Sequence, residues 1–159
     1  MCSASREYYL KPGYIYCSRE PVVVYTVLGS CVAVTLWDSR GRFSAINHYL
    51  LPSCPEGEAP TARYGEVAMF ALYKMMREQG AKPHTMTAQI FGGGDLRGSR
   101  IGSDNIAVAR EFLQAKKVYV SSEDVGGTLG RKVVYHAHTN ETVVLKVEKL
   151  RRSDWYPYE

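Results

Sequence analysis

A cysteine at position 31 and a histidine at position 48 are the residues whose types and spacing point to chemistry. They lie in two strand-like segments, 31–37 and 42–50, which flank a turn sequence at 38–41. A histidine beside a cysteine lowers the pKa of the thiol and holds a reactive thiolate, as in cysteine-dependent hydrolases. The pair therefore predicts nucleophilic catalysis if the fold brings the two side chains together.

The register of this expected hairpin decides whether the two side chains meet. A two- or four-residue loop centred between Ser39 and Arg40 places Cys31 opposite His48. The expected pairs are Trp37–Arg42, Thr35–Ser44, Ala33–Ile46 and Cys31–His48. Directly opposed residues have Cβ atoms about 4.5–5.5 Å apart. A three-residue loop or a bulge would shift the pairing by one residue and separate the thiol from the imidazole.

The residues before Cys31 suit an oxyanion site. Gly29 leaves room for a sharp turn or for close approach of a substrate. The backbone N–H groups around Ser30 and Cys31 would then face a developing oxyanion. The alternative is plain packing, because a free cysteine is usually buried as a small hydrophobic residue.

Two other patterns are weaker. The glycines at 92–94 follow a strand, but they fit neither nucleotide-binding fingerprint, so a tight turn between layers is expected. His136 and His138 would share a strand face, and His84 and Cys54 are the candidates for a third metal ligand. An isolated H-x-H lacks the spacing of a zinc site, so we expect ordinary surface or core histidines and neither metal nor cofactor.

The elements around the pair indicate a covered sheet, because the expected hairpin is apolar on both faces. One face carries Val32, Val34, Leu36, Phe43, Ala45 and Tyr49; the other carries Ala33, Ile46 and Leu50 with Cys31 and His48. A sheet of this kind packs against other layers on both sides. The cysteine and histidine would then lie at a rim or cleft of a layered sandwich.

The remaining chain supplies two helices and about seven strands in mixed order. Apolar residues at helical spacing predict one helix over 64–79, stopped by Gly80, and another from Ser103 or Asp104 to about Ala115. The strands expected besides the hairpin are 22–28, 85–91, 117–121, 132–136 and 142–148. This order predicts a single-domain α+β layered fold. We expect an irregular lead-in at 1–20, the domain at 21–150 and a tail at 151–159.

Composition excludes several classes of protein. The chain has 159 residues, of which 45% are hydrophobic and 23% charged, so it is neither disordered nor fibrous. The net charge of +4 is low for a nucleic-acid-binding protein, so we expect no nucleic-acid partner. No apolar run is long enough to enter a bilayer, and no secretory signal is recognisable, so a cytoplasmic location is expected. Cys2, Cys17 and Cys54 are expected to be free, structural or incidental thiols.

Six sequence blocks then stand out together. They are LGSCVAVTLWD (28–38), INHYLLP (46–52), RYGEVAMFALYKMM (63–76), QIFGGG (89–94), IGSDNI (101–106) and EDVGGTLGRKV (123–133). In content and order they resemble the chemoreceptor glutamine deamidase family, CheD, over most of residues 22–147. The resemblance implies an α/β/β sandwich with mixed sheets.

The resemblance also implies an activity and its residues. The family deamidates selected glutamines on chemotaxis receptors with a cysteine nucleophile, a histidine base and a threonine that orients the histidine. These map to Cys31, His48 and Thr26, with Thr35 as the fallback for the threonine. A methyl-accepting chemotaxis receptor is the implied protein substrate, and some members also bind a CheC-type phosphatase, a partner left open here.

The leading hypothesis is therefore a protein-glutamine glutaminase that works through a cysteine thioester. Cys31 would attack the glutamine amide, backbone N–H groups near Gly29 and Ser30 would hold the oxyanion, and His48 would transfer protons. The alternative is a non-catalytic adaptor that docks on receptors or on a chemotaxis phosphatase. Another thiol hydrolase, such as a peptidase, is the third hypothesis.

Overall fold

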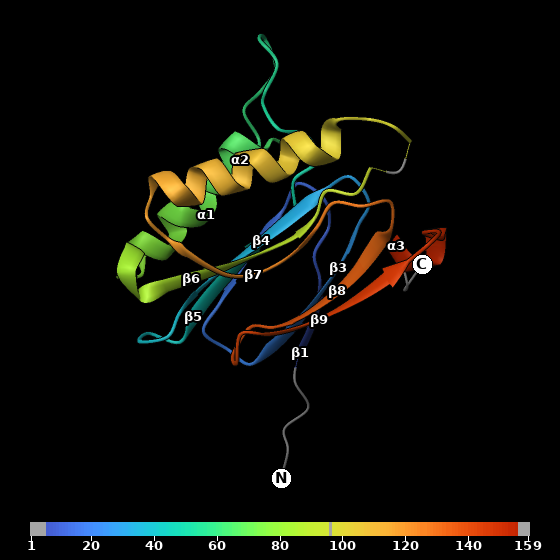
Figure 1. Ribbon diagram of the computed structural model, residues 1–159. Helices are drawn as coiled ribbons and strands as arrows, with labels where there is room; N and C mark the ends of the chain where they lie inside the picture. Colours follow the sequence, from blue (N-terminus) through green and yellow to red (C-terminus); the bar gives the residue numbers. More distant parts are fainter. Residues whose placement is uncertain (1–5, 96, 156–159) are drawn as a thin grey trace.

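Two helices, a five-stranded sheet and a four-stranded sheet form three stacked layers in the computed structural model (Figure 1). The structure describes residues 6–95 and 97–155. Both helices lie on one face of the five-stranded sheet, and the four-stranded sheet covers its other face (Figure 1). The expected α+β layered sandwich with mixed sheets and two main helices is confirmed.

The central, five-stranded sheet carries the expected hairpin. Its order is β2 (Ile15–Ser18), β5 (Phe43–Asn47), β4 (Val32–Asp38), β6 (Met86–Gly92) and β7 (Tyr119–Val125). Neighbouring strands are antiparallel except β6 and β7, which are parallel. Helices on one side and a sheet on the other bury both faces of β4 and β5, and every residue of the two strands except the half-buried Trp37 is buried.

The outer sheet has four strands. Its order is β1 (Arg6–Tyr9), β3 (Val22–Leu28), β8 (Gly130–His136) and β9 (Glu141–Val147). β1 runs parallel to β3, and the other neighbours are antiparallel. β3 alternates between core and surface, and its core face includes Thr26. The position of this polar side chain inside an apolar layer is the first structural sign of a site.

The two main helices begin and end close to the expected residues. α1 (Gly65–Glu78) buries Ala68, Leu72 and Met76, and Gly80 with φ +95° follows its end. α2 (Ile101–Ala115) begins two residues before the expected Ser103. Its N-cap residue, Arg100, makes no side-chain capping hydrogen bond. A short 3₁₀ helix, η1 (Pro83–Thr85), precedes β6.

Two apolar cores lie on either side of the central sheet. The helix-side core contains the predicted hairpin face: Val32, Val34, Leu36, Phe43, Ala45 and Tyr49. The inter-sheet core contains Ala33 and Ile46 from the other face, and Cys31 packs against it. The face assignment made from the sequence is therefore confirmed, and Cys31 belongs to the layer between the two sheets.

The ends of the domain differ from the expectation. Residues 6–9 and 15–18 are strands, so the irregular lead-in at 1–20 is wrong over those residues. They were missed because a four-residue edge strand is too short to show a period. In the expected tail, α3 (Arg152–Trp155) contacts β3. Residues 1–5 and 156–159, including Cys2, lie outside the described residues.

Candidate active site

Cys31 lies immediately before β4, in a segment whose backbone is held from two sides. The carbonyls of Gly29 and Cys31 accept hydrogen bonds from the backbone of Gly94 (2.9 Å) and Gly93 (2.8 Å). The carbonyl of Ser30 accepts one from the side chain of Asn105 (3.0 Å). The thiol is half-buried, so it is neither sealed in the core nor free on the surface. This fixed backbone is what an oxyanion site formed by N–H groups would need.

The glycines at 92–94 make this close packing possible. A Cβ atom on Gly92 would lie 2.2 Å from the carbonyl oxygen of Cys31, and Gly92 has φ +101°. A Cβ atom on Gly93 would lie 2.4 Å from the side chain of Ile106 in α2. Neither position therefore tolerates a larger residue without displacement. The glycine run acts as the tight turn between layers that the sequence predicts.

The hairpin register differs from the prediction by two residues. Ile46 lies opposite Thr35, and Asp38 lies opposite Phe43. The turn starts one residue later than expected because Asp38 stays in the strand and accepts the backbone N–H of Arg40 (3.1 Å). Direct pairing of Cys31 with His48 is therefore wrong.

The shift nevertheless leaves both residues on one face. Side chains alternate between faces with a period of two, so a displacement by two residues preserves every face assignment. Val32 and Tyr49 bridge the two segments, which makes Cys31 and His48 diagonal neighbours across them. Both side chains face the outer sheet, and the His48 ring contacts Thr26 there.

Thr26 contacts the imidazole of His48. Its hydroxyl donates to the carbonyl of Leu10 (2.9 Å) and lies 2.7 Å from Nδ1 of His48. The single hydroxyl proton is used on Leu10, so Nδ1 carries the ring proton and donates to Thr26. Nε2 is then an unprotonated acceptor, and it is buried without a hydrogen-bond partner among the described residues. The fallback, Thr35, does not fill this position, since Thr26 makes the contact.

Burial determines the charge of the thiol and the imidazole. Burial raises the pKa of the Cys31 thiol to about 11, partly opposed by the residue's own backbone N–H. Burial lowers the pKa of His48 to about 3. Burial thus favours the neutral form of both groups, so it opposes the lowering of the thiol pKa that a neighbouring histidine was expected to cause. The physical reason is that a desolvated imidazole stays neutral and provides no positive charge for a thiolate.

The segment after β1 supports the histidine from the other side. The carbonyl of Leu10 holds Thr26, and the N–H of Gly13 donates to the carbonyl of His48 (2.7 Å). Gly13 has φ +86°, so the turn that makes this contact favours glycine. The lead-in expected to be irregular is thus part of the site, and its sequence shows no motif that would have revealed this.

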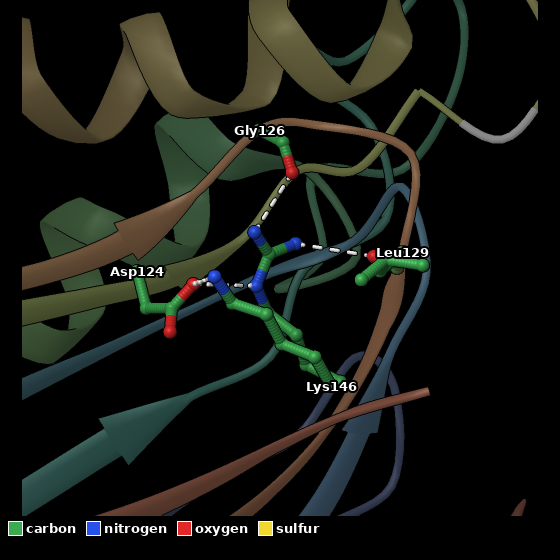
Figure 2. Close-up of polar contacts among 5 residues, drawn as sticks. Asp124, Gly126, Leu129 and Lys146 are labelled. Atoms are coloured by element: carbon green, nitrogen blue, oxygen red, sulfur yellow. Dashed lines mark hydrogen bonds and ion pairs between the residues drawn. The ribbon is translucent and has the colours of Figure 1, made fainter. Parts of the chain in front are cut away.

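A buried arginine stabilises the loop that follows β7. Arg131 is 3% exposed, and its guanidinium donates to Asp124 (3.0 Å) and to the carbonyls of Gly126 (2.7 Å) and Leu129 (3.3 Å). Figure 2 shows this cluster with Lys146, whose ammonium lies 3.2 Å from Asp124. The cluster joins β7 of the central sheet to β8 and β9 of the outer sheet.

The loop held by Arg131 also contacts the glycine turn. Gly126 donates its N–H to the carbonyl of Gly92 (2.9 Å), and Asp95 donates to the carbonyl of Gly127 (2.7 Å). Because the same glycine turn bonds the carbonyl of Cys31, the arginine cluster is connected to the cysteine segment by a short series of backbone contacts.

The other candidate groups are not assembled into a site. Within the described ranges, no three His, Cys, Asp or Glu side chains are grouped so as to hold a metal. Cys17 and Cys54 are free thiols; Cys17 contacts Met75, and Cys54 points at backbone carbonyls of its own loop. Between residues 6 and 155, leaving out 96, no helix is both long and apolar enough to cross a membrane.

Asn105 is the site residue that the motif search missed. It is fully buried in α2 and bonds the carbonyl that precedes Cys31. The signal was available, because Asn105 falls on the buried stripe formed by Gly102, Ile106, Ala109 and Leu113. A polar amide on an apolar helix face indicates a specific hydrogen-bonding task.

Comparisons with known proteins agree on one family. The family model described as CheD chemotactic sensory transduction matches residues 50–146, a range that begins just after His48 and includes Asn105 and Arg131. A probable chemoreceptor glutamine deamidase CheD 2 of Geobacter sulfurreducens is 38% identical over 146 residues, covering 89% of this chain and 90% of its own. A probable chemoreceptor glutamine deamidase CheD of Rhodospirillum rubrum is 35% identical, covering 88% and 82%.

Two further likenesses differ in strength. A probable chemoreceptor glutamine deamidase CheD 1 of Anaeromyxobacter dehalogenans is 41% identical over 133 residues, covering 80% of this chain and 77% of its own. A crystal structure of a Neisseria meningitidis protein of the DUF152 family model gives a TM-score of 0.42 at 13% identity. It covers 78% of this chain and 63% of its own, a likeness too weak to bear on function.

Proposed function

The chain belongs to the CheD family, and from that premise we propose that it hydrolyses the side-chain amide of selected glutamines on chemotaxis receptors. The products are glutamate and ammonia. The observation that carries the proposal is the contact of Thr26 with Nδ1 of His48, which leaves Nε2 as a proton acceptor in the layer that Cys31 faces. The CheD relatives are named for this reaction.

The first half of the reaction forms a thioester. Sγ of Cys31 attacks the δ-carbon of the glutamine side chain while Nε2 of His48 accepts the thiol proton. The amide oxygen becomes an oxyanion, and backbone N–H groups at Ser30 and Cys31 stabilise it. The protonated imidazole then gives its proton to the amide nitrogen, the C–N bond breaks, and ammonia leaves.

The second half regenerates the thiol. His48 takes a proton from a water molecule, which attacks the thioester carbon. The C–S bond breaks, the proton returns to Sγ of Cys31, and a glutamate side chain is released. Each turnover consumes one water molecule, and no other co-reactant is needed.

The neutral ground state of both groups determines the order of these steps. Since burial raises the pKa of Cys31 and lowers that of His48, it disfavours a thiolate–imidazolium pair before the attack. The proton moves during the attack, as it does when a serine hydrolase activates its hydroxyl. Thr26 then has a defined role, because only the tautomer protonated on Nδ1 presents a bare Nε2.

Mass spectrometry of a co-expressed receptor tests the proposal. Cys31→Ala should leave the receptor fully amidated, and His48→Ala should slow deamidation by about 10²–10⁴-fold. Thr26→Val should slow it by about 10–10²-fold, the cost found when a partner that orients a metal-bound histidine is removed. Cys17→Ala is the matched control, since Cys17 packs on the helix side of the sheet and should leave activity unchanged.

Two results would contradict the proposal. Wild-type deamidation by folded Cys31→Ala protein would exclude the cysteine mechanism. A receptor that binds the protein but gains no acidic residue would favour the adaptor alternative, and a cut receptor backbone would indicate a peptidase.

A further inference from the structure

We propose that Asn105 is a positioning residue that sets the placement of Cys31 relative to His48. The catalytic roles of that pair rest on the proposed function, whereas the placement itself rests on hydrogen bonds of α2. Asn105 is fully buried, so it acts through the backbone of the site and does not touch the substrate.

The side-chain amide of Asn105 joins the two segments that carry the pair. Nδ2 donates to the carbonyl of Ser30 (3.0 Å), the residue before Cys31. It also donates to the carbonyl of Leu50 (2.9 Å), two residues after His48. An amide nitrogen has two hydrogens, so both are used in linking these segments.

The β-ladder holds this spacing only in part, through the two backbone hydrogen bonds between Val32 and Tyr49 (3.1 and 2.9 Å). Continuous pairing of β4 with β5 ends at Thr35 and Ile46, and only the bridge between Val32 and Tyr49 follows. The N–H of Val34 is turned to the side chain of Asn47 (2.9 Å), which interrupts the ladder directly beside the pair. Asn105 thus supplies a cross-link where regular strand pairing has stopped.

The same bond orients the peptide between Ser30 and Cys31. In a trans peptide the C=O and N–H groups point in opposite directions. Because Asn105 holds the carbonyl of Ser30 toward α2, the N–H of Cys31 points away from α2. That N–H is one of the donors proposed for the oxyanion, so Asn105 also fixes its direction.

Two further features indicate a role beyond stability. Oδ1 of Asn105 is buried and has no hydrogen-bond partner within the described residues, a state that costs free energy of folding. The backbone carbonyl of Asn105 accepts the hydroxyl of Tyr49 (2.5 Å), which ties the residue after His48 to the same helical turn. An apolar residue at position 105 would leave no unsatisfied oxygen, but it would also make no hydrogen bonds to the carbonyls of Ser30 and Leu50.

A double-mutant cycle on Cys31 alkylation tests the placement without any receptor. The rate of modification by iodoacetamide is measured from pH 6 to pH 10 for wild type, Asn105→Ala, His48→Ala and the double variant. If Asn105 aligns Sγ of Cys31 with Nε2 of His48, the imidazole accepts the thiol proton as the sulfur attacks iodoacetamide. Each single change then lowers the rate, and the double change lowers it no further. Additive effects, or a wild-type rate that His48→Ala leaves unchanged, would overturn the proposal.

Deamidation kinetics supply the second readout. Asn105→Asp removes both donors at nearly constant shape and should lower kcat by about 10²-fold, because small misplacements of reacting groups are that costly. KM should stay unchanged. Gln89→Glu is the matched control: Nε2 of Gln89 also donates twice, to Asn140, and lies away from the pair.

The two variants separate placement from general loss of a buried amide. The proposal predicts a kcat loss for Asn105→Asp only, measured on protein shown to be folded by circular dichroism. Equal kcat losses for both variants, or an unchanged kcat for Asn105→Asp, would overturn it. If wild-type protein deamidates no receptor, the proposed function fails while the alkylation cycle still decides the placement.

Discussion

His48 shows at the level of one residue how the site affects stability. The imidazole is 1% exposed, and burial holds its pKa at about 3 against an ordinary value of 6.5. Between pH 6.5 and pH 3 the unfolded chain therefore binds a proton that the folded protein does not. The free energy of unfolding must fall as the pH falls through this window.

Urea unfolding at pH 7 and pH 4 measures this effect. The free energy of unfolding of wild type should drop by about 3 kcal/mol more than that of His48→Gln, because each unit of pKa shift corresponds to about 1.4 kcal/mol. The carboxylates titrate in both proteins, so their contribution cancels in the comparison. Equal drops would mean that the imidazole gains its proton in the folded protein near its ordinary pKa.

Sequence reasoning reached some residues of the site and missed others for definite reasons. Cys31 and His48 followed from side-chain alternation, which depends on sequence alone. Thr26 required the family resemblance, because it belongs to the other sheet. The contact of Leu10 with Thr26 could not be predicted from the sequence, because Leu10 contributes a backbone carbonyl, which every residue type has.

At the scale of elements, the hairpin shows which part of a prediction is robust. The turn centre was misplaced by one residue, which moved every pair by two, yet the faces stayed correct. Faces depend on the parity of the register, whereas pairs depend on turn conformation. In that turn Arg42 has φ +49°. An arginine in the sequence does not predict a positive φ, because residues other than glycine seldom adopt it.

The loop after β7 is the element on which the arginine cluster acts. Arg131→Met would leave two carbonyls and Asp124 without their buried donor, and should lower the free energy of unfolding by about 3 kcal/mol. Amide exchange at Gly126 and Asp95 should become faster, since both N–H groups belong to contacts of this loop.

Lys146→Met provides the matched comparison for that loop. Lys146 pairs with the same carboxylate of Asp124, but its side chain is 50% exposed. Its replacement should cost less than about 1 kcal/mol and leave the loop protected. Equal losses for both variants would show that stability depends on the charge around Asp124 and not on the carbonyl bonds of Arg131.

The whole molecule places one site across two sheets. Thr26 belongs to the outer sheet, whereas Cys31 and His48 flank strands of the central sheet. Thr26 contacts the ring of His48, and Cys31 packs against the same inter-sheet core. The helix-side core lies on the other face of the central sheet. The alignment of the site should therefore depend on packing between the sheets and on the hydrogen bonds of Asn105 more than on apolar packing against α1.

Two leucine-to-alanine substitutions, one in each core, distinguish the effect of packing between the sheets from the effect of packing on the helix side. Leu28 and Leu72 are both fully buried, the first in the inter-sheet core and the second on the buried face of α1 in the helix-side core. Leu28→Ala and Leu72→Ala should each lower the free energy of unfolding by about 2–5 kcal/mol.

Only Leu28→Ala should also lower the kcat of the folded protein, by about tenfold or more, because Leu28 lies between Thr26 and Cys31 in sequence and packs against Gly92. Deamidation rates are compared at a temperature where circular dichroism shows both variants folded. A kcat loss in Leu72→Ala equal to that in Leu28→Ala would mean that the site responds to global stability and not to the spacing of the two sheets.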